Sequence, residues 1–262
     1  YSISRLCLGD FNVMIQVKDL HKTFEGKHVL RGVEFDVKTG EAIAIIGISG
    51  SGKSVILKHL IGLLKPDRGE VWMDNNLVSA MSFRKLQTVR EKIGMVFQSG
   101  ALFDSMNVKD NISLALKKLT KLKGKSLEDR VKESLESVNM SGTQDLMPSE
   151  LSGGMKKRVG IARAIAIKPE YLFYDEPTTG LDPIMTDVIN RLIIKFQKSG
   201  NITTVIVTHE MSTVYDVVDR VILLHDGKIR FSGTPDEIKE SEDVVVKQFI
   251  NGDSTLIEQE IA

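Results

Sequence analysis

The sequence predicts an α/β fold that combines an antiparallel β part with a helical subdomain. Apolar residues alternate with polar ones over 15–17 and again over 33–37, which is typical of strands in an antiparallel sheet. The continuous apolar run 42–46 precedes a glycine-rich turn and a segment with helical spacing, the strand, loop and helix order of an α/β protein. Amphipathic helical patterns fill the middle third of the chain.

The composition suits one large globular domain or two small ones. With 262 residues, 42% hydrophobic and 27% charged, the chain is neither disordered nor a coiled coil. Lysine plus arginine and aspartate plus glutamate number 35 each, so no overall positive field attracts nucleic acid, and we expect no nucleic-acid partner. The single cysteine, Cys7, excludes an intramolecular disulfide and favours a reducing, cytosolic compartment. No apolar run approaches the roughly 18 residues that span a bilayer, so at a membrane another chain would supply the span.

One composite domain is expected over 14–250, with the helical subdomain at about 100–165. Residues 1–13 are interpreted as an extension of uncertain origin, because the chain does not open with methionine and Met14 directly precedes the first alternating segment. Residues 251–262 are expected to form a short C-terminal tail.

The elements follow from the same patterns. Helices are expected over about 53–64, over 108–119 and over 127–138, the last with Ser126 as its N-cap. The further elements are strands over 95–97, 171–174 and 203–207, a helix begun by Asp182 and Pro183, a helix from about Met211, and a hairpin over 221–231.

The glycine-rich turn matches the phosphate-binding pattern G-x-x-x-x-G-K-[ST], and a buried strand precedes it while a helix follows it. Its residues are Gly47, Ile48, Ser49, Gly50, Ser51, Gly52, Lys53 and Ser54. Backbone N–H groups of such a loop surround phosphate oxygens, and the helix N-terminus adds a partial positive charge. The pattern predicts that Lys53 reaches the β and γ phosphates of a nucleotide and that the Ser54 hydroxyl binds Mg²⁺.

Two other interpretations of these glycines fit the sequence less well. A chance glycine turn would lack the strand and helix context, and the spacing G-x-G-x-x-G of dinucleotide-binding loops is absent. Gly124-Lys125-Ser126 repeats the letters GKS, but neither the upstream glycine nor a buried strand precedes it, so a surface turn is expected there.

Two adjacent carboxylates end the apolar strand 171–174. Asp175 is expected to orient the magnesium shell, and Glu176 is expected to accept the proton of the attacking water. An apolar strand that ends in acidic residues is also common in α/β proteins without such a role. Together with the phosphate loop, the pair predicts nucleotide hydrolysis.

The segment Leu151-Ser152-Gly153-Gly154-Met155 resembles the signature motif of the ATP-binding cassette (ABC) ATPases. Its glycines open a second helix N-terminus that suits an anion, although glycines also begin helices without binding one. The resemblance extends over about 15–250 and implies a P-loop NTPase core of the ABC type. It also implies a homodimer, in which the signature of one chain closes over the nucleotide on the phosphate loop of the other.

Four further positions resemble family motifs. Gln98 resembles the glutamine that links the nucleotide site to the helical subdomain, and His209 resembles the histidine that contacts the γ-phosphate. Asp182 resembles the aspartate at the dimer interface, but it could simply cap a helix. Phe24 lies where the family places an aromatic ring on adenine, but it could be a core residue.

Met155 departs from the glutamine that most ABC proteins carry at the end of the signature. With the segments 146–150, 156–158 and 97–103, it resembles the Mla/Mce-type lipid transport ATPases.

The resemblance implies an ATP-hydrolysing transporter subunit with Mg²⁺ as cofactor and ATP as substrate, peripheral on the cytoplasmic face of the inner membrane. The implied partners are a second copy, an integral membrane permease contacted near 101–108, and substrate-binding or lipid-binding accessory subunits. The alternatives are another cargo (an amino acid, a metal or a drug), a non-transport ABC ATPase of DNA repair or translation, and a nucleotide-binding regulatory subunit.

Overall fold

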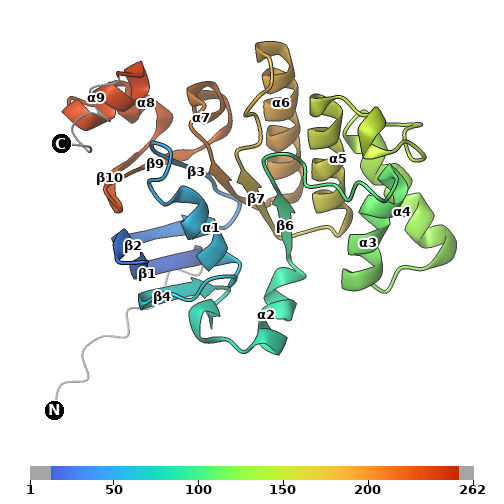
Figure 1. Ribbon diagram of the computed structural model, residues 1–262, viewed down its shortest axis with the longest axis horizontal. Helices are drawn as coiled ribbons and strands as arrows, with labels where there is room; N and C mark the ends of the chain where they lie inside the picture. The colour runs from blue at the N-terminus through green and yellow to red at the C-terminus, as the bar shows by residue number, and fades with distance from the viewer. Residues whose placement is uncertain (1–12, 254–262) are drawn as a thin grey trace.

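A six-stranded, mostly parallel sheet runs through the centre of the computed structural model, which describes residues 13–253 (Figure 1). Its strand order is β10, β9, β3, β8, β7 and β6, and only the β9–β10 pair is antiparallel. The strands are β3 (Ala42–Ile46), β6 (Ile93–Val96), β7 (Tyr171–Asp175), β8 (Thr203–Val207), β9 (Arg220–His225) and β10 (Lys228–Gly233).

A second, antiparallel sheet of four strands lies beside the start of the first helix (Figure 1). In spatial order its strands are β2 (Lys27–Lys38), β1 (Val13–Phe24), β4 (Arg68–Met73) and β5 (Asn76–Leu77). The alternation over 15–17 and 33–37 places Ile15, Val17, Val33 and Val37 in the interior, so this sheet buries one face and exposes the other.

Helices cover the large sheet on both sides (Figure 1). They are α1 (Lys53–Leu60), α2 (Phe83–Arg90), α3 (Val108–Leu119), α4 (Gly124–Ser137), α5 (Gly153–Ala166), α6 (Pro183–Gly200), α7 (Met211–Val217), α8 (Pro235–Lys239) and α9 (Val244–Asn251), with 3₁₀ turns η1 (Val78–Ala80) and η2 (Pro148–Glu150). The packed helices α3, α4 and α5 stand together beyond the β6 edge and form the helical part of the molecule (Figure 1).

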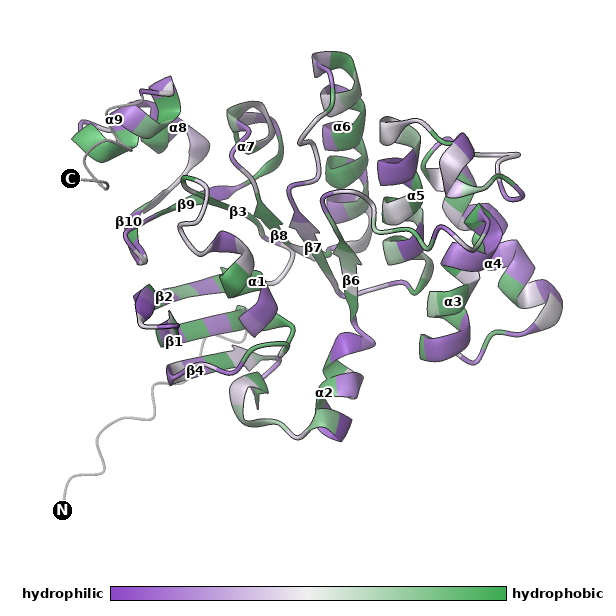
Figure 2. Cartoon of the chain, viewed as in Figure 1, coloured by the Kyte–Doolittle hydropathy of each residue, from purple (hydrophilic) through white to green (hydrophobic). Residues whose placement is uncertain are grey.

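Strand β3 is buried on both faces, which explains its unbroken apolar sequence. Ile43 and Ile45 face the core shared with the antiparallel sheet and α1, whereas Ala42, Ala44 and Ile46 face the core shared with the other helices. Figure 2 shows the hydrophobic central strands and the many hydrophilic residues of α4. This burial fixes β3 and therefore the loop at its carboxyl end.

The predicted α/β fold, its antiparallel part, the helix over 108–119, the strand over 203–207 and the hairpin over 221–231 are confirmed. Within residues 13–253, no helix combines the length and the apolarity that crossing a bilayer requires. Residues 1–12 of the predicted extension 1–13 and residues 254–262 of the predicted tail lie outside the described residues.

Three local expectations are wrong. Helix α1 ends at Leu60 and not near residue 64, because Gly62 adopts a φ of 65° and the Leu63 N–H bonds back to the Lys58 carbonyl at 2.8 Å. Ser126 does not cap α4, because its hydroxyl donates to the Lys123 carbonyl at 2.8 Å within a helix that already begins at Gly124. The segment 124–126 is therefore the first turn of α4 and not a surface turn.

Candidate active site

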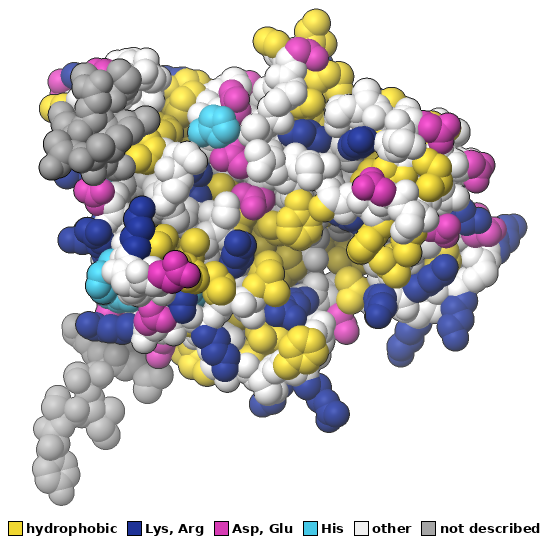
Figure 3. Space-filling model, viewed as in Figure 1, with side chains coloured by type: hydrophobic (Ala, Val, Ile, Leu, Met, Phe, Trp, Pro, Cys, Tyr) yellow, Lys and Arg dark blue, Asp and Glu magenta, His cyan; other side chains and the backbone are white. Residues whose placement is uncertain are grey.

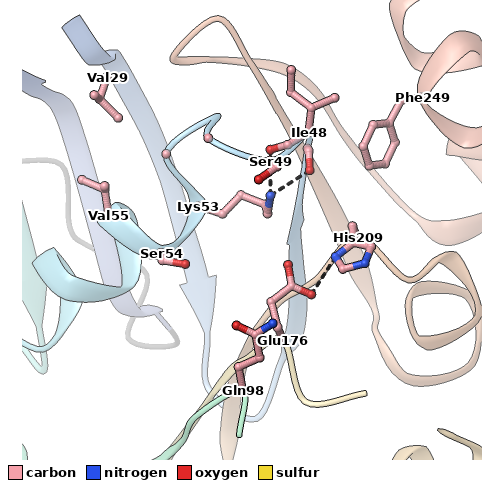
Figure 4. Close-up of a pocket in the computed structure, with 13 residues that line it drawn as sticks. Val29, Ile48, Ser49, Lys53, Ser54, Val55, Gln98, Glu176, His209 and Phe249 are labelled. Atoms are coloured by element: carbon pink, nitrogen blue, oxygen red, sulfur yellow. Dashed lines mark hydrogen bonds and ion pairs between the residues drawn. The ribbon is translucent and has the colours of Figure 1, made fainter. Parts of the chain in front are cut away.

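A cavity of about 670 Å³ opens where the parallel strands β3, β6, β7 and β8 reach their carboxyl ends. This edge of a parallel sheet is where α/β proteins bind their ligands. The lining residues come from the phosphate loop and α1, from the segments that follow β6, β7 and β8, and from β2 and α9 (Figure 4). They are Val29, Gly47, Ile48, Ser49, Gly50, Gly52, Lys53, Ser54, Val55, Gln98, Glu176, His209 and Phe249.

The phosphate loop wraps back over the start of α1. Gly47 has a φ of 151°, and a Cβ atom there would lie 2.4 Å from the Leu224 carbonyl oxygen, so only glycine fits. Lys53 is buried, and its Nζ donates to the Gly47 and Ile48 carbonyls at 2.8 Å each (Figure 4). Burial lowers the pKa of the Lys53 ammonium, and the nearby carboxylates of Glu176 and Asp175 oppose this shift. An anion in the cavity would compensate this desolvated charge.

Ser51 is the predicted loop residue that does not line this cavity. It lines a neighbouring hollow of about 240 Å³, and its buried hydroxyl has no hydrogen-bond partner among the described residues.

Ser54 lines the cavity and places its hydroxyl beside Asp175, which is not itself among the lining residues. The Ser54 hydroxyl donates to Asp175 Oδ1 at 3.0 Å. Burial is the main cause that raises the pKa of the Asp175 carboxyl, while the Ser54 hydrogen bond acts in the opposite direction. A hydroxyl and a carboxylate are hard oxygen donors, and Mg²⁺ typically takes one or two carboxylates plus substrate phosphates. The pair therefore fits the predicted magnesium site, without a larger carboxylate cluster among residues 13–253.

Glu176 follows β7 directly and has a strained backbone. Its φ is 52°, which is uncommon for a residue with a side chain, and its N–H donates to the Val207 carbonyl at 2.8 Å. The side-chain Oε2 lies 2.8 Å from His209 Nδ1 and accepts a hydrogen bond from Thr179 Oγ1 at 2.9 Å. Figure 4 shows the second carboxylate oxygen pointing toward Lys53. The carboxylate is thus held at one oxygen and presents the other to the phosphate side of the cavity.

The structure brings Gln98 to the cavity but leaves Phe24 outside the residues that line it. Phe24 ends β1 with 39% of its surface exposed, and Lys22 Nζ lies 5.4 Å from the centre of its ring. Adenine stacking on Phe24 stays a prediction. Sequence reasoning missed three lining residues, Val29 on β2, Val55 on α1 and Phe249 on α9. Val55 directly follows the phosphate-binding pattern, whereas Val29 and Phe249 lie in no motif, so only the folded chain reveals those two.

The signature segment lies elsewhere on the molecule. Ser152 is exposed and caps α5, where its hydroxyl accepts a hydrogen bond from the Met155 N–H at 3.3 Å. It does not line the cavity, and α5 stands apart from α1 (Figure 1). Asp182 caps α6 by accepting from the Met185 N–H at 2.9 Å. The phosphate loop and the signature of one chain therefore do not meet.

Comparison with known proteins identifies the family of this chain. The family model described as "ABC transporter" matches residues 30–179, more than half of the chain. TRIGALACTOSYLDIACYLGLYCEROL 3 of Arabidopsis thaliana is 41% identical over 93% of this chain and 75% of its own. The intermembrane phospholipid transport system ATP-binding protein MlaF of Haemophilus influenzae is 38% identical over 92% of this chain and 91% of its own. The probable ribonucleotide transport ATP-binding protein mkl of Mycobacterium leprae is 39% identical over 92% and 69%.

Solved structures show the same fold. A dimeric, post-hydrolysis state of the ATP-binding cassette MJ0796, bound to ADP and Pi, matches with a TM-score of 0.79 and 32% identity over 85% of this chain and 99% of that one. CbiO1 of Clostridium perfringens, part of an ABC transporter complex, matches with a TM-score of 0.81 and 31% identity over 95% and 99%. On the family model, the relatives and the fold together, the chain belongs to the ABC transporter family.

Proposed function

We propose that the chain is the ATP-hydrolysing subunit of a transporter for phospholipids, working as a homodimer beneath a separate membrane permease. One observation supports hydrolysis above all others. The buried ammonium of Lys53, the hydroxyl of Ser54 and the oriented carboxylate of Glu176 line one cavity, and the Ser54 hydroxyl is bonded to the Asp175 carboxylate. A site that only bound nucleotide would not need the oriented carboxylate.

Each group has a role in this proposal. The phosphate loop binds the triphosphate through its N–H groups, and Lys53 exchanges its loop carbonyls for β and γ phosphate oxygens. Ser54 and Asp175 would hold Mg²⁺, which neutralises phosphate charge when it is bound. The free oxygen of Glu176 accepts a proton from the water that attacks the γ-phosphorus, and the products are ADP and inorganic phosphate.

The exposed signature supports the dimer. Ser152 and the N-terminus of α5 offer anion-binding groups outside the cavity of their own chain. A second copy related by a two-fold axis would bring this end over the open cavity and complete two equivalent sites.

A band of exposed apolar side chains supports a membrane partner. Leu63 and Phe97 border a hollow of about 210 Å³, and Phe83 and Phe103 are also exposed. Figure 3 shows hydrophobic side chains gathered over the region between α2, the end of β6 and α3. Apolar patches of this kind mark protein interfaces. The band includes part of the predicted permease contact near 101–108, which would place the chain on the cytoplasmic face of the inner membrane.

The cargo is proposed from the names of the relatives. MlaF is named for intermembrane phospholipid transport, whereas mkl is named for probable ribonucleotide transport. We favour phospholipid because the signature segment with Met155 also resembles the lipid transport subgroup. Accessory substrate-binding or lipid-binding subunits would complete the assembly.

Two measurements test the proposal. Purified wild-type chain should hydrolyse ATP in the presence of Mg²⁺, and Glu176→Gln should lower kcat by about 10² to 10⁴ while nucleotide still binds. Unchanged hydrolysis in Glu176→Gln would remove Glu176 as the base. The native complex, purified from membranes, should contain a permease with bound phospholipid. A complex that carries ribonucleotide, amino acid, metal or drug and no lipid would overturn the cargo.

A further inference from the structure

Lys157 is a buried charged residue on α5 that the proposed chemistry does not use. Only 6% of its surface is exposed. Its Nζ crosses from α5 to the loop between β7 and α6 and donates to the Thr179 carbonyl at 2.6 Å. Burial lowers the pKa of the Lys157 ammonium, and the negative charge of Glu176 opposes that shift, so the two charges are close enough to interact. A buried ammonium without a partner would be costly, so this contact fixes the loop to α5.

Thr179 continues the contact to the carboxylate. While its carbonyl accepts from Lys157, its side-chain Oγ1 donates to Glu176 Oε2 at 2.9 Å. Two hydrogen bonds therefore connect the helix that begins with the signature to the side chain of Glu176. His209, which follows β8, contacts the same Oε2 atom at 2.8 Å.

This connection decides where the second carboxylate oxygen points. With Oε2 held by Thr179 and His209, the other oxygen is directed toward Lys53 (Figure 4). If the loop at Thr179 moved, Oε2 would keep only its contact with His209. The carboxylate could then rotate away from the position of the attacking water. A misplacement of about 1 Å can lower a rate about 10²-fold.

Helix α5 is also attached to the segment after Gln98. Arg163 donates to the Gly100 and Ala101 carbonyls at 2.7 Å each. One helix thus contacts the segment after Gln98 through Arg163 and the Glu176 loop through Lys157. A movement of α5 when its N-terminus engages a partner would be transmitted to both loops.

We propose that Lys157 is a positioning residue for ATP hydrolysis, which holds the Glu176 carboxylate in its productive orientation through Thr179. The inference rests on the proposed function of Glu176 as the base. It assigns Lys157 no contact with nucleotide, since Lys157 does not line the cavity.

Lys157→Met tests the proposal, because methionine fills the space of the aliphatic part of the lysine side chain but neither donates a hydrogen bond nor carries a charge. We expect kcat for ATP to fall about 10-fold to 10²-fold, while KM and the dissociation constant for ATP stay within about two-fold of wild type. Lys157→Arg, which retains charge and donors, should recover most of the rate. Lys156→Met is the matched control, removing the same charge from the adjacent, partly exposed position, and it should hydrolyse ATP like wild type.

A double-mutant cycle tests the route. Thr179→Val removes the hydroxyl that bonds Glu176, and in a Lys157→Met background it should lower kcat much less than it does alone, because both changes break one chain of contacts. Strictly additive effects would overturn the proposal. If Lys157→Met does not fold, Lys157→Gln replaces it in the test. Because glutamine can still donate a hydrogen bond, kcat of Lys157→Gln should fall by less than the decrease expected for Lys157→Met.

A folded Lys157→Met or Lys157→Gln variant with wild-type kcat, or one whose loss lies wholly in ATP affinity, would overturn the positioning role. Glu176→Gln separates the two failures. If Glu176→Gln abolishes hydrolysis while the Lys157 variants hydrolyse ATP like wild type, Glu176 remains the base and only the role of Lys157 is wrong. If the Glu176→Gln variant hydrolyses ATP normally, the proposed function itself is wrong.

Discussion

His209 Nδ1 lies 2.8 Å from Glu176 Oε2, and the other ring nitrogen, Nε2, lies 3.8 Å from Glu210 Oε1. The ring follows β8 and the carboxylate follows β7, and these neighbouring parallel strands bring them together. Half of the His209 surface is exposed, whereas Glu176 is 13% exposed. The histidine is therefore the accessible member of the pair and can meet both the base and a ligand that enters the cavity.

This pair predicts a graded effect of His209 variants. His209→Ala removes one of the two contacts on Glu176 Oε2 and the group that the family resemblance predicts to contact the γ-phosphate, so kcat should fall by about 10²-fold or more. His209→Asn can place an amide donor near the position of Nδ1 and should lose less. The measurements are steady-state rates of ATP hydrolysis and equilibrium dissociation constants for nucleotide, for wild type and both variants. Equal activity in wild type and His209→Ala would show that the contact does not contribute to turnover.

The adenine ring has two candidate stacking partners, Phe24 and Phe249. Phe24 matches the family position but lies outside the cavity lining, whereas Phe249 on α9 lines it. If Phe24 stacks on adenine, Phe24→Ala should weaken ATP binding by about 3-fold to 10-fold, the equivalent of about 0.5–1.5 kcal/mol. Binding of inorganic triphosphate, which has no base, should be unchanged. Calorimetric titration of both variants with both ligands decides the assignment, and a loss confined to Phe249→Ala would move the adenine to the α9 side.

The sequence predicted the parts of the site whose geometry is local. The phosphate loop, the ends of β7 and β8 and the start of α5 are each set by a strand-to-loop or loop-to-helix transition that short motifs encode. Val29 and Phe249 line the cavity from β2 and α9, and no local sequence pattern places these two segments beside the phosphate loop. Lys157 is similar, because a lysine within a basic run predicts a solvated face until the fold shows it buried.

Short elements were also missed for a physical reason. The strands β4 and β5 and the helix α2 span six, two and eight residues, too few for a periodic pattern to stand out. The start of α4 was misplaced because a serine near a helix start can donate to a carbonyl as well as accept from an N–H.

Asp243 predicts an acid-dependent attachment of α9. It accepts from the Val245 and Val246 N–H groups, and Arg230 Nη2 lies 2.7 Å from Oδ2. The Arg230 hydrogen bond is the main cause that holds the pKa of Asp243 below its ordinary 3.8. Because the pKa is lower in the folded state, the contact stabilises the protein above pH 3.8, and the stabilisation is lost as the pH falls through the folded-state pKa.

Asp243→Asn should therefore lower Tm by a constant amount between pH 7 and pH 5, and the difference from wild type should narrow below about pH 4. Asparagine can still cap α9, so the change reports mainly the charge. Asp236→Asn, in an exposed pair with Lys239, is the control and should change Tm little at any pH. If the difference in Tm between wild type and Asp243→Asn grew as the pH fell, the predicted direction of the pH dependence would be wrong.

Gly100 predicts a measurable cost of separating α5 from the segment after Gln98. Its φ is 76°, and a Cβ atom there would lie 2.7 Å from the Lys156 carbonyl oxygen on α5. Gly142 has a similar φ of 79°, but nothing lies within 4 Å of its added Cβ. Gly142→Ala therefore reports the cost of the left-handed backbone alone, about 1 kcal/mol. Gly100→Ala adds a backbone clash and should destabilise by about 2 kcal/mol more. Urea unfolding of both variants measures the difference, and equal losses would show that α5 and this segment can separate freely.

ATPase assays should show Gly100→Ala losing more kcat than Gly142→Ala, because only Gly100 lies where α5 contacts the Gln98 side of the cavity.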